Sequence, residues 1–263
     1  MIMQCVCGLA KFLAAFCVLL SAHAEERFAC EPITGTEQLW SKPALRFVVV
    51  GEMHGTKETP AIFKDLVCSA RELKRPIIVG IELKKQGAVD RFMASGDHDL
   101  AANGADGRTS QAMLALLEDL RALKLGGVVS RVVAFSATRR GETAAKGEER
   151  MASALLAAAR RRPKALVIAL TGNVHACKKT IAEVGSYPLM ASFLPNAETV
   201  SLFATDRGGE AWNCQDDGCR PHSLSSSGGF QREIRLSPGA SPLPGYDGVL
   251  STGMAATASS PAR

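Results

Sequence analysis

The sequence predicts an α/β fold, with a mostly parallel sheet, helices on both of its faces and a small antiparallel appendage toward the C-terminus. Two observations predict this class. Short apolar segments rich in β-branched residues alternate with segments in which apolar residues recur every three or four positions. The links between successive segments are short, as in chains whose parallel strands are joined by crossover helices. No segment of the chain repeats another.

Five segments have the composition of buried strands. Each is a short, predominantly apolar run with glycine, proline or polar residues near its ends. The segments are residues 46–50, 77–81, 128–135, 165–170 and 199–203. Apolar strands of this kind are typical of a sheet that is covered on both faces.

Three helical patterns lie between these strands. Residues 60–73 begin with Pro60, which fits the first turn of a helix. Residues 110–125 carry a stripe of methionine and leucine along one face and are followed by two glycines. Residues 148–161 are rich in alanine and end before Pro163. Strands and helices therefore alternate through most of the chain.

The remaining segments lack this alternation. Residues 97–108 are rich in glycine and polar residues and are expected to form an inserted loop. The region around Trp212 and residues 230–236 are expected to form the antiparallel appendage. We therefore expect one domain over residues 25–236 and an irregular tail over residues 237–263, where proline, glycine, serine and alanine occur without periodicity.

The first 24 residues have the pattern of a secretory signal peptide. Lys11 precedes an unbroken apolar run over residues 12–20, and Ala-His-Ala ends at Ala24, where we expect cleavage. The run is too short to span a bilayer, and no cysteine that could carry a lipid directly follows the cleavage point. The sequence thus predicts a secreted or periplasmic protein without a stable membrane anchor.

Charge and composition exclude one class of partner. Removing residues 1–24 takes away one cation, Lys11, and no acid, so the formal net charge falls from +5 to +4. Aromatic residues are only 5% of the chain, too few for stacking platforms between basic residues. We therefore expect a small-molecule or peptide substrate and no nucleic acid.

Five of the eight cysteines remain after signal cleavage. They are Cys30, Cys68, Cys177, Cys214 and Cys219. The last two flank the turn-like sequence Gln-Asp-Asp-Gly, so we expect a disulfide between them in an oxidising compartment. A metal site at this pair is disfavoured, because no second pair lies at zinc-ribbon spacing. The odd number leaves at least one thiol free or paired with another chain, and the pairing of the first three stays open.

Three strand ends deliver acids and histidines. The motif Gly-Glu-Met-His-Gly at residues 51–55 follows the first strand and contains Glu52 and His54. Glu82 directly follows the second strand, and Gly-Asn-Val-His after the fourth strand ends at His175. Ligands of an open parallel sheet bind outside the carboxyl ends of its strands. The sequence therefore predicts one site built from these four side chains.

Each candidate also has a structural interpretation. Taken singly, His54 could bond to a backbone carbonyl, and Glu82 could cap a helix. Glu58 could act only as a first-turn carboxylate that favours the helix dipole. Arg108 could hold an anionic substrate, although solvated surface charge is the default for such a residue. We include Glu58, Arg108 and Asn173 as substrate-binding candidates.

Three further reactive side chains are expected to play no part in chemistry. Cys177 follows His175 by two residues, and we expect it to be structural. His98 lies in the polar loop, and His222 follows Cys-Arg-Pro. Both histidines are expected at the surface.

These motifs resemble a superfamily that joins erythromycin esterases, ChaN-type haem-binding proteins and Tiki/TraB proteins. The resemblance lies in residues 51–55 with Glu58, in Glu82 and in Gly172 to His175, and it covers roughly residues 45–205. The stretches 106–113 and 257–262 are similar to exported members. The superfamily implies a mostly parallel sheet, with a pocket between the two histidine motifs and the acids.

Members of the superfamily differ in activity, so the resemblance implies several functions. Erythromycin esterases hydrolyse a macrolactone with a histidine base, Tiki proteins resemble metal-dependent peptidases, and ChaN-type members bind haem. This chain has only two tyrosines, Tyr187 and Tyr246, which disfavours haem ligation by tyrosine.

The leading hypothesis is hydrolysis of an ester or amide bond. In one version His54, oriented by Glu52 or Glu82, takes a proton from water and His175 donates to the oxyanion. In the other version the same four side chains hold a divalent ion, zinc or manganese. The second ranks slightly ahead, because two carboxylates in one pocket repel without a cation. The alternatives are a haem or metal binding and uptake protein, or an exported binding module that has lost activity.

Overall fold

The computed structural model describes residues 30–97, 107–137 and 141–262. The chain divides into two units, Met1–Glu31 and Pro32–Arg263, and only the last two residues of the first unit are described. The predicted signal peptide, residues 1–24, lies outside the described residues, as do His98 and most of the loop expected at residues 97–108. The following description concerns the second unit.

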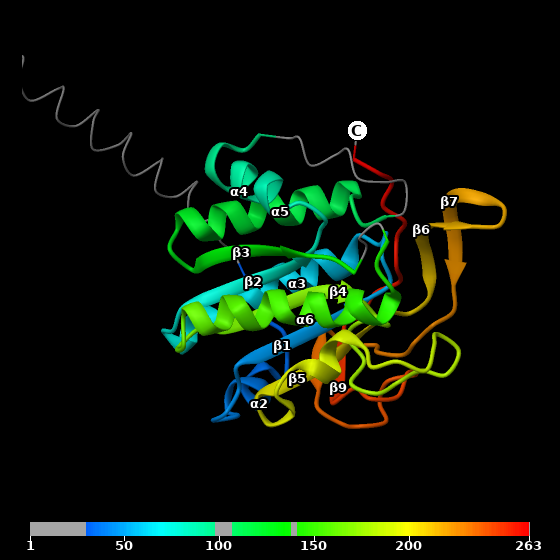
Figure 1. Ribbon diagram of the computed structural model, residues 1–263. Coiled ribbons are helices and arrows are strands. Elements are labelled where there is room, and N and C mark those ends of the chain that lie inside the picture. Colours follow the sequence, from blue (N-terminus) through cyan, green and yellow to red (C-terminus); the bar gives the residue numbers. More distant parts are fainter. Residues whose placement is uncertain (1–29, 98–106, 138–140, 263) are drawn as a thin grey trace, which may run out of the picture. The chain divides into compact units, whose positions relative to one another are not determined.

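Seven strands form one sheet in the order β3-β2-β4-β1-β5-β9-β8 (Figure 1). Their bounds are β1 Phe47–Glu52, β2 Ile77–Glu82, β3 Val129–Phe135, β4 Leu166–Gly172, β5 Thr199–Thr205, β8 Glu233–Arg235 and β9 Gly248–Ser251. All neighbours are parallel except β8, which pairs antiparallel with β9. The predicted fold class is confirmed.

The five predicted strand segments correspond to β1 to β5. Every residue of β1, β2, β4 and β5 is buried, which explains their nearly unbroken apolar sequences. The chain leaves β1, forms β2 and β3 on one side, and then returns to place β4 between β2 and β1. The carboxyl ends of β2, β4 and β1 therefore lie next to one another.

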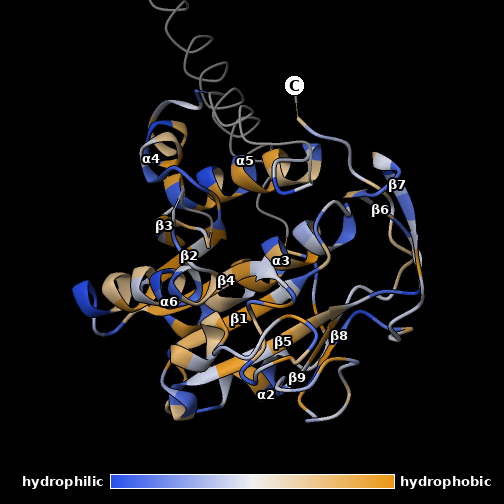
Figure 2. Ribbon diagram, turned by 45° about the vertical axis from the view of Figure 1, so that its right-hand side comes forward, coloured by the Kyte–Doolittle hydropathy of each residue, from blue (hydrophilic) through white to orange (hydrophobic). Residues whose placement is uncertain are grey.

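Helices cover both faces of the sheet. They are α2 Thr36–Trp40, α3 Glu58–Ser69, α4 Gln86–Ser95, α5 Gln111–Leu125 and α6 Ala144–Arg161, with 3-10 turns η1 Ala70–Leu73, η3 Met190–Phe193 and η4 Asn196–Glu198. Figure 2 shows α6 and α3 on opposite sides of the strands. Alternate residues of β1 and β4, such as Phe47 and Val167, share one core cluster with the apolar stripe of α6.

The helices predicted from residues 60 and 148 differ from the observed ones in their boundaries. The first helix ends at Ser69, and the predicted last turn is the 3-10 segment η1. The helix predicted from residue 148 begins at Ala144, because Thr143 accepts a hydrogen bond from the main-chain N–H of Lys146 and caps the helix there. Residues 144–147, its first turn, carry no large apolar side chain, so the apolar spacing did not reveal it.

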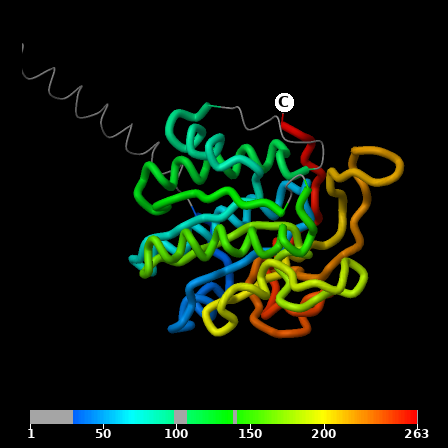
Figure 3. The backbone as a smooth tube through the Cα atoms, viewed as in Figure 1, coloured from blue at the N-terminus to red at the C-terminus, as the bar shows by residue number. Residues whose placement is uncertain are grey.

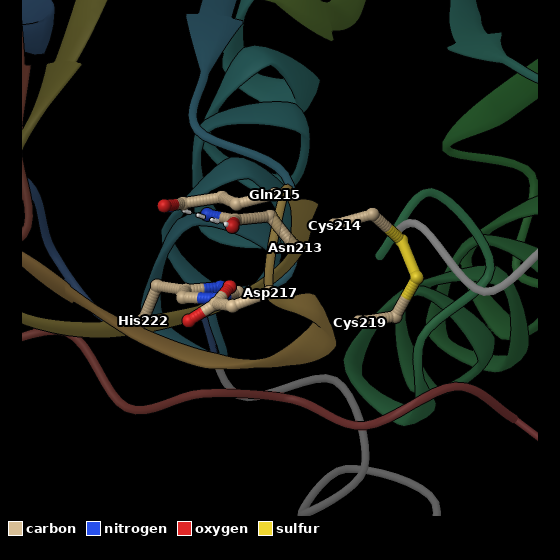
Figure 4. Close-up of a disulfide and its surroundings, with 6 residues drawn as sticks. All are labelled: Asn213, Cys214, Gln215, Asp217, Cys219 and His222. Carbon is tan, nitrogen blue, oxygen red and sulfur yellow. Dashed lines mark hydrogen bonds and ion pairs between the residues drawn. A yellow bond between two sulfur atoms is a disulfide. The ribbon is translucent and has the colours of Figure 1, made fainter.

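A two-stranded antiparallel hairpin follows the fifth strand, as predicted. It consists of β6 Gly209–Gln215 and β7 Gly218–Leu224. The predicted disulfide between Cys214 and Cys219 is present and joins the two strands next to the turn (Figure 4). Residues 230–236, expected in the same appendage, instead supply β8 at the edge of the main sheet.

The expectation of an irregular tail over residues 237–263 is wrong in part. This region contains β9, whose four residues are all buried and pair with β5. The strand is too short to show a period, and it lies among glycines and prolines, so its sequence resembles a loop. Residues 256–262, which we call the C-terminal strap, then extend away from the sheet (the red end of the chain in Figure 3).

The described cysteines include disulfides, as expected for an oxidising compartment. Cys30 and Cys68 are each disulfide-bonded, while Cys177 is a buried free thiol. Across the part of the chain that the structure describes, no helix has the length and apolar character needed to cross a membrane.

Candidate active site

Three neighbouring strand ends position the first side chains of the site. Glu52 is the last residue of β1 and Glu82 the last residue of β2. Gly172 ends β4, which lies between them, and is paired in register with Glu52. Both carboxylates are buried, with 3% and 6% of the residue exposed. Buried acids of this kind need partners, because an unpartnered charge in the interior is costly.

His54 lies in the turn after β1, with its ring between the two carboxylates. Its Nδ1 is 2.9 Å from Oε1 of Glu52, and its Nε2 is 3.5 Å from Oε2 of Glu82. Gly55 follows with φ of 85°, a conformation that favours glycine, and so lets the chain turn away directly after the histidine. The ring also passes close to β4, because a Cβ at Gly172 would lie 3.0 Å from Nε2 of His54.

Glu82 is the centre of the site. Its Oε2 accepts hydrogen bonds from Oγ1 of Thr171 at 2.7 Å and from the main-chain N–H of Gly172 at 2.8 Å. Its Oε1 accepts a hydrogen bond from Nε of Arg108 at 3.0 Å and lies 3.8 Å from Nε2 of His175. One carboxylate therefore faces two imidazoles and one guanidinium, and it does not cap a helix.

Glu148 is a site residue that the sequence analysis missed. Its Oε1 lies 2.7 Å from Nδ1 of His175, and its Oε2 accepts a hydrogen bond from the main-chain N–H of Met190 at 2.8 Å. Glu148 belongs to α6, not to a strand end, so the rule that located the other residues did not apply. A signal was available, since it stands one turn before Met151 and Ala152 on the buried stripe of that helix.

The charges of the site alternate from Glu52 through His54, Glu82 and His175 to Glu148. Burial alone lowers the pKa of His54, but the hydrogen bond with Glu52 and the nearby carboxylate of Glu82 outweigh it and raise the pKa to about 10. Burial likewise opposes the charged form of His175, whose pKa is nevertheless raised by its hydrogen bond with Glu148 and by Glu82. The ring of His54 is therefore an imidazolium ion at neutral pH, and the surroundings of His175 also favour its charged form.

The same charges act on Glu82. Burial alone raises the pKa of this carboxyl, but the imidazole of His54 and the surrounding positive charges hold it well below its usual range. Glu82 is therefore ionised at every pH near neutrality. The repulsion between two carboxylates that the sequence implied is offset here by cations of the protein itself.

The raised pKa of His54 predicts how stability depends on pH. Because the folded pKa is about 10 and the ordinary value is 6.5, this group stabilises the fold fully below pH 6.5 and loses its contribution as pH rises toward 10. We expect the difference in free energy of unfolding between the wild type and His54→Gln to shrink steadily from pH 6 to pH 10. Urea denaturation at several pH values measures this, and a difference that does not change with pH would contradict it.

Glu148 predicts a measurable change at His175. Glu148→Gln removes the negative charge while keeping the shape, so the pKa of His175 should fall toward its ordinary value. Glu149→Gln, at the exposed neighbouring position, is the matched control and should leave that pKa unchanged. NMR titration of the His175 ring measures both, and equal shifts in the two variants would refute the pairing.

The other candidates lie around this centre with different contacts. Glu58 begins α3, and its carboxylate accepts a hydrogen bond from the main-chain N–H of Thr257 at 2.8 Å. Asn173 donates its main-chain N–H to the carbonyl oxygen of Glu52, and its own carbonyl oxygen accepts a hydrogen bond from the Tyr246 hydroxyl. Arg108 contacts Glu82 directly and so lies beside the four strand-end residues. Binding of substrate by these three residues stays a prediction.

His222 does not lie at the surface, contrary to expectation. Only 8% of it is exposed, and its Nε2 is 2.8 Å from Oδ1 of Asp217 (Figure 4). It belongs to the hairpin, where it pairs across the strands with the buried residue Ala211. The hairpin register, which sequence reading did not supply, determines this burial.

The hydrogen bonds of the site bear on metal binding in two ways. Both oxygens of Glu82 accept hydrogen bonds, which compete with metal ligation. Each imidazole directs Nδ1 to a carboxylate, as the histidine ligands of metal sites do, and turns Nε2 toward Glu82. In the described ranges, no group of three or more His, Cys, Asp or Glu side chains is arranged to hold an ion. Metal binding by Glu52, His54, Glu82 and His175 stays a prediction. Haem binding also stays a prediction. The hydroxyl of Tyr246 already donates a hydrogen bond to the carbonyl oxygen of Asn173, which does not favour haem ligation by this tyrosine.

Comparison with known proteins adds the fold and no more. No protein-family model matches the chain, and no curated protein matches it. A solved structure of a protein from Bacillus cereus has a TM-score of 0.57 and 11% identity, and the alignment covers 86% of this chain and 93% of the other. A solved succinoglycan biosynthesis protein has a TM-score of 0.58 and 10% identity, covering 89% and 94%. At these identities the chain shares the fold of both proteins.

Proposed function

We propose that this chain is a hydrolase that cleaves an ester or amide bond at the site around Glu82. The observation that supports it most is the position of the His54 ring, which is held between two buried carboxylates at 2.9 Å and 3.5 Å. A second imidazole and a guanidinium lie on the other side of the same Glu82. Acid–base groups and fixed positive charges in one place are what acyl transfer to water requires.

The raised pKa changes the role that sequence suggested for His54. A protonated imidazole donates a proton and cannot accept one, so we assign His54 as the general acid. Among the described residues, no hydrogen-bond donor reaches the buried Oε2 of Glu52, so this oxygen is an unpaired acceptor beside the ring of His54. We assign Glu52 as the general base, and His175 and Arg108 as the groups that stabilise the oxyanion.

The proposed step transfers one proton at each end. The oxygen of a water molecule attacks the carbonyl carbon while Oε2 of Glu52 takes one of its protons. Negative charge on the carbonyl oxygen is stabilised by the imidazolium of His175 and the guanidinium of Arg108. When the carbon–oxygen or carbon–nitrogen bond breaks, Nε2 of His54 gives its proton to the leaving group. Exchange with solvent then restores the starting protonation of Glu52 and His54.

Two further elements belong to the proposal. We place the protein in the superfamily of erythromycin esterases, ChaN-type and Tiki/TraB proteins on the motifs of its sequence. We also place it outside the cytoplasm, secreted or periplasmic, which its disulfides support. A haem or metal binding protein of the ChaN type is the second candidate, favoured only by the resemblance.

Hydrolysis by the purified chain tests the proposal. A panel of nitrophenyl esters, lactones and peptide amides should contain at least one substrate that the chain hydrolyses above background, and dialysis against a chelator should not remove this activity. Activity that a chelator abolishes and that zinc or manganese restores would favour the metal version. A Soret band on addition of haem, with no hydrolysis of any compound in the panel, would favour the second candidate and overturn the first.

A further inference from the structure

Two turns that are far apart in the sequence each bring a side chain to Glu82. The turn after β1 carries His54, and the segment that precedes α5 carries Arg108. Neither turn belongs to a strand of the main sheet. The hydrogen bonds of that sheet therefore do not determine the spacing between the two turns.

The backbones of the two turns touch through glycines. Gly55 and Gly107 both have positive φ, 85° and 79°. A Cβ at Gly107 would lie 2.8 Å from Cα of Gly55 and 2.6 Å from the carbonyl oxygen of Trp212. Only glycine allows this approach. Because the backbones are in contact, a displacement of one turn is transmitted to the other.

Ser259 of the C-terminal strap bonds to both sides of this contact. Its main-chain N–H donates to the carbonyl oxygen of Gly55 at 2.8 Å. Its Oγ accepts a hydrogen bond from the main-chain N–H of Ala112, in the first turn of α5, at 2.9 Å. Only 1% of Ser259 is exposed. One buried residue thus links the turn that carries His54 to the helix start that follows Arg108.

Main-chain hydrogen bonds on either side of Ser259 repeat this pattern. The N–H of Lys57 donates to the carbonyl oxygen of Thr257 at 2.9 Å. On the other side, the main-chain N–H of Gln111 donates to the carbonyl oxygen of Ser260 at 2.9 Å. The main-chain N–H of Ala262, in the strap, donates to the carbonyl oxygen of Thr109 at 2.8 Å. Figures 1 and 3 show the strap, in red, passing between β6 and the helices α3 and α5.

Ser259 also completes the cap of α5. The first N–H groups of a helix have no partner within the helix. Ser110 serves one of them, since its Oγ accepts a hydrogen bond from Met113 at 3.3 Å. The main-chain N–H of Ala112 instead donates to Oγ of Ser259, which lies 147 residues further along the chain. The start of α5 is therefore fixed in part by the strap.

We infer that Ser259 is a positioning residue, which holds the two turns at the spacing at which His54 and Arg108 both reach Glu82. The kinetic consequence of this inference rests on the proposed function. The inference about the spacing of the two turns does not rest on the proposed function, because the contact between Arg108 and Glu82 can be observed without any substrate.

The test compares Ser259→Ala with Ser260→Ala in the full chain. The first variant removes the acceptor for Ala112, while the second alters an exposed neighbour whose carbonyl oxygen, not its side chain, bonds to the described residues. We expect Ser259→Ala to lower kcat about tenfold with KM within about twofold, because small misplacement of reacting groups slows the chemical step. We also expect the Nε–H resonance of Arg108 to move in Ser259→Ala only.

Each outcome decides the inference. If kcat and the Arg108 resonance of Ser259→Ala match the wild type, Ser259 positions nothing. If kcat falls while the resonance stays in place, the loss arises elsewhere and the inference is equally overturned. If the wild type hydrolyses no compound, the proposed function fails. The positioning role of Ser259 is then decided only by whether the Arg108 resonance moves in Ser259→Ala. Should Ser259→Ala not fold, Ser259→Gly removes the same hydroxyl and takes its place.

Discussion

Replacing Glu82 by glutamine is expected to lower the free energy of unfolding by about 3–5 kcal/mol at pH 7, the range for removing one partner of a buried ion pair. The side chain keeps its shape, so no cavity forms. What is lost is the negative charge that His54, His175 and Arg108 surround. These three side chains then remain close together with no carboxylate between them.

The control for this variant is an ion pair near the surface. Glu198 lies 3.4 Å from Arg46, and about a third of each side chain is exposed. Glu198→Gln should therefore cost less than about 1 kcal/mol, because solvent screens such pairs. Urea denaturation at pH 7 measures both variants. A cost for Glu82→Gln as small as that of Glu198→Gln would show that the charges around Glu82 are not coupled as the distances imply.

Replacing His54 by alanine is expected to lower kcat by about 10²–10⁴-fold, the range for a positioned acid or base. The variant removes the proton donor and leaves the carboxylates of Glu52 and Glu82 without the cation between them. The wild type should also lose activity as pH rises through about 10, where the ring gives up its proton. Activity that instead rises toward pH 10 would make His54 the base, as the sequence suggested.

His222→Ala provides the matched control for this loss. His222 is also buried and paired with a carboxylate, that of Asp217 at 2.8 Å, but it belongs to the hairpin and has no part in the proposed step. Steady-state kinetics of both variants, each checked for folding by circular dichroism, separate catalysis from general disturbance. Wild-type kcat in His54→Ala would remove the centre of the proposed mechanism.

Sequence was a good guide to the sheet because the strands are buried on both faces. Continuous apolar runs such as residues 77–81 indicate a strand clearly, and the acids at or near the ends of two of them, Glu52 and Glu82, stand out. The parallel topology places Glu52, Glu82 and His175 at the same edge of the sheet, without knowledge of any distance. What the sequence could not supply was the order of the strands, which makes β4 the neighbour of both β1 and β2.

The parts that sequence missed depend on contacts between remote segments. Glu148 partners His175 from a helix, and the strap reaches the start of α5 across 147 residues. The protonation state of His54 could not be predicted from the sequence either, because its pKa depends on the distances to Glu52 and Glu82, which only coordinates provide. The short strand β9 was hidden because four residues are too few to display a period.

The buried thiol of Cys177 has a consequence for how the chain matures. Its Sγ lies 2.6 Å from the carbonyl oxygen of Pro244, and burial raises its pKa, so little thiolate forms. Exchange with a disulfide requires a thiolate that can reach it. Once folded, the chain thus gives the Cys177 thiol little chance to attack the disulfides among the described residues, so these pairings are protected from exchange with it.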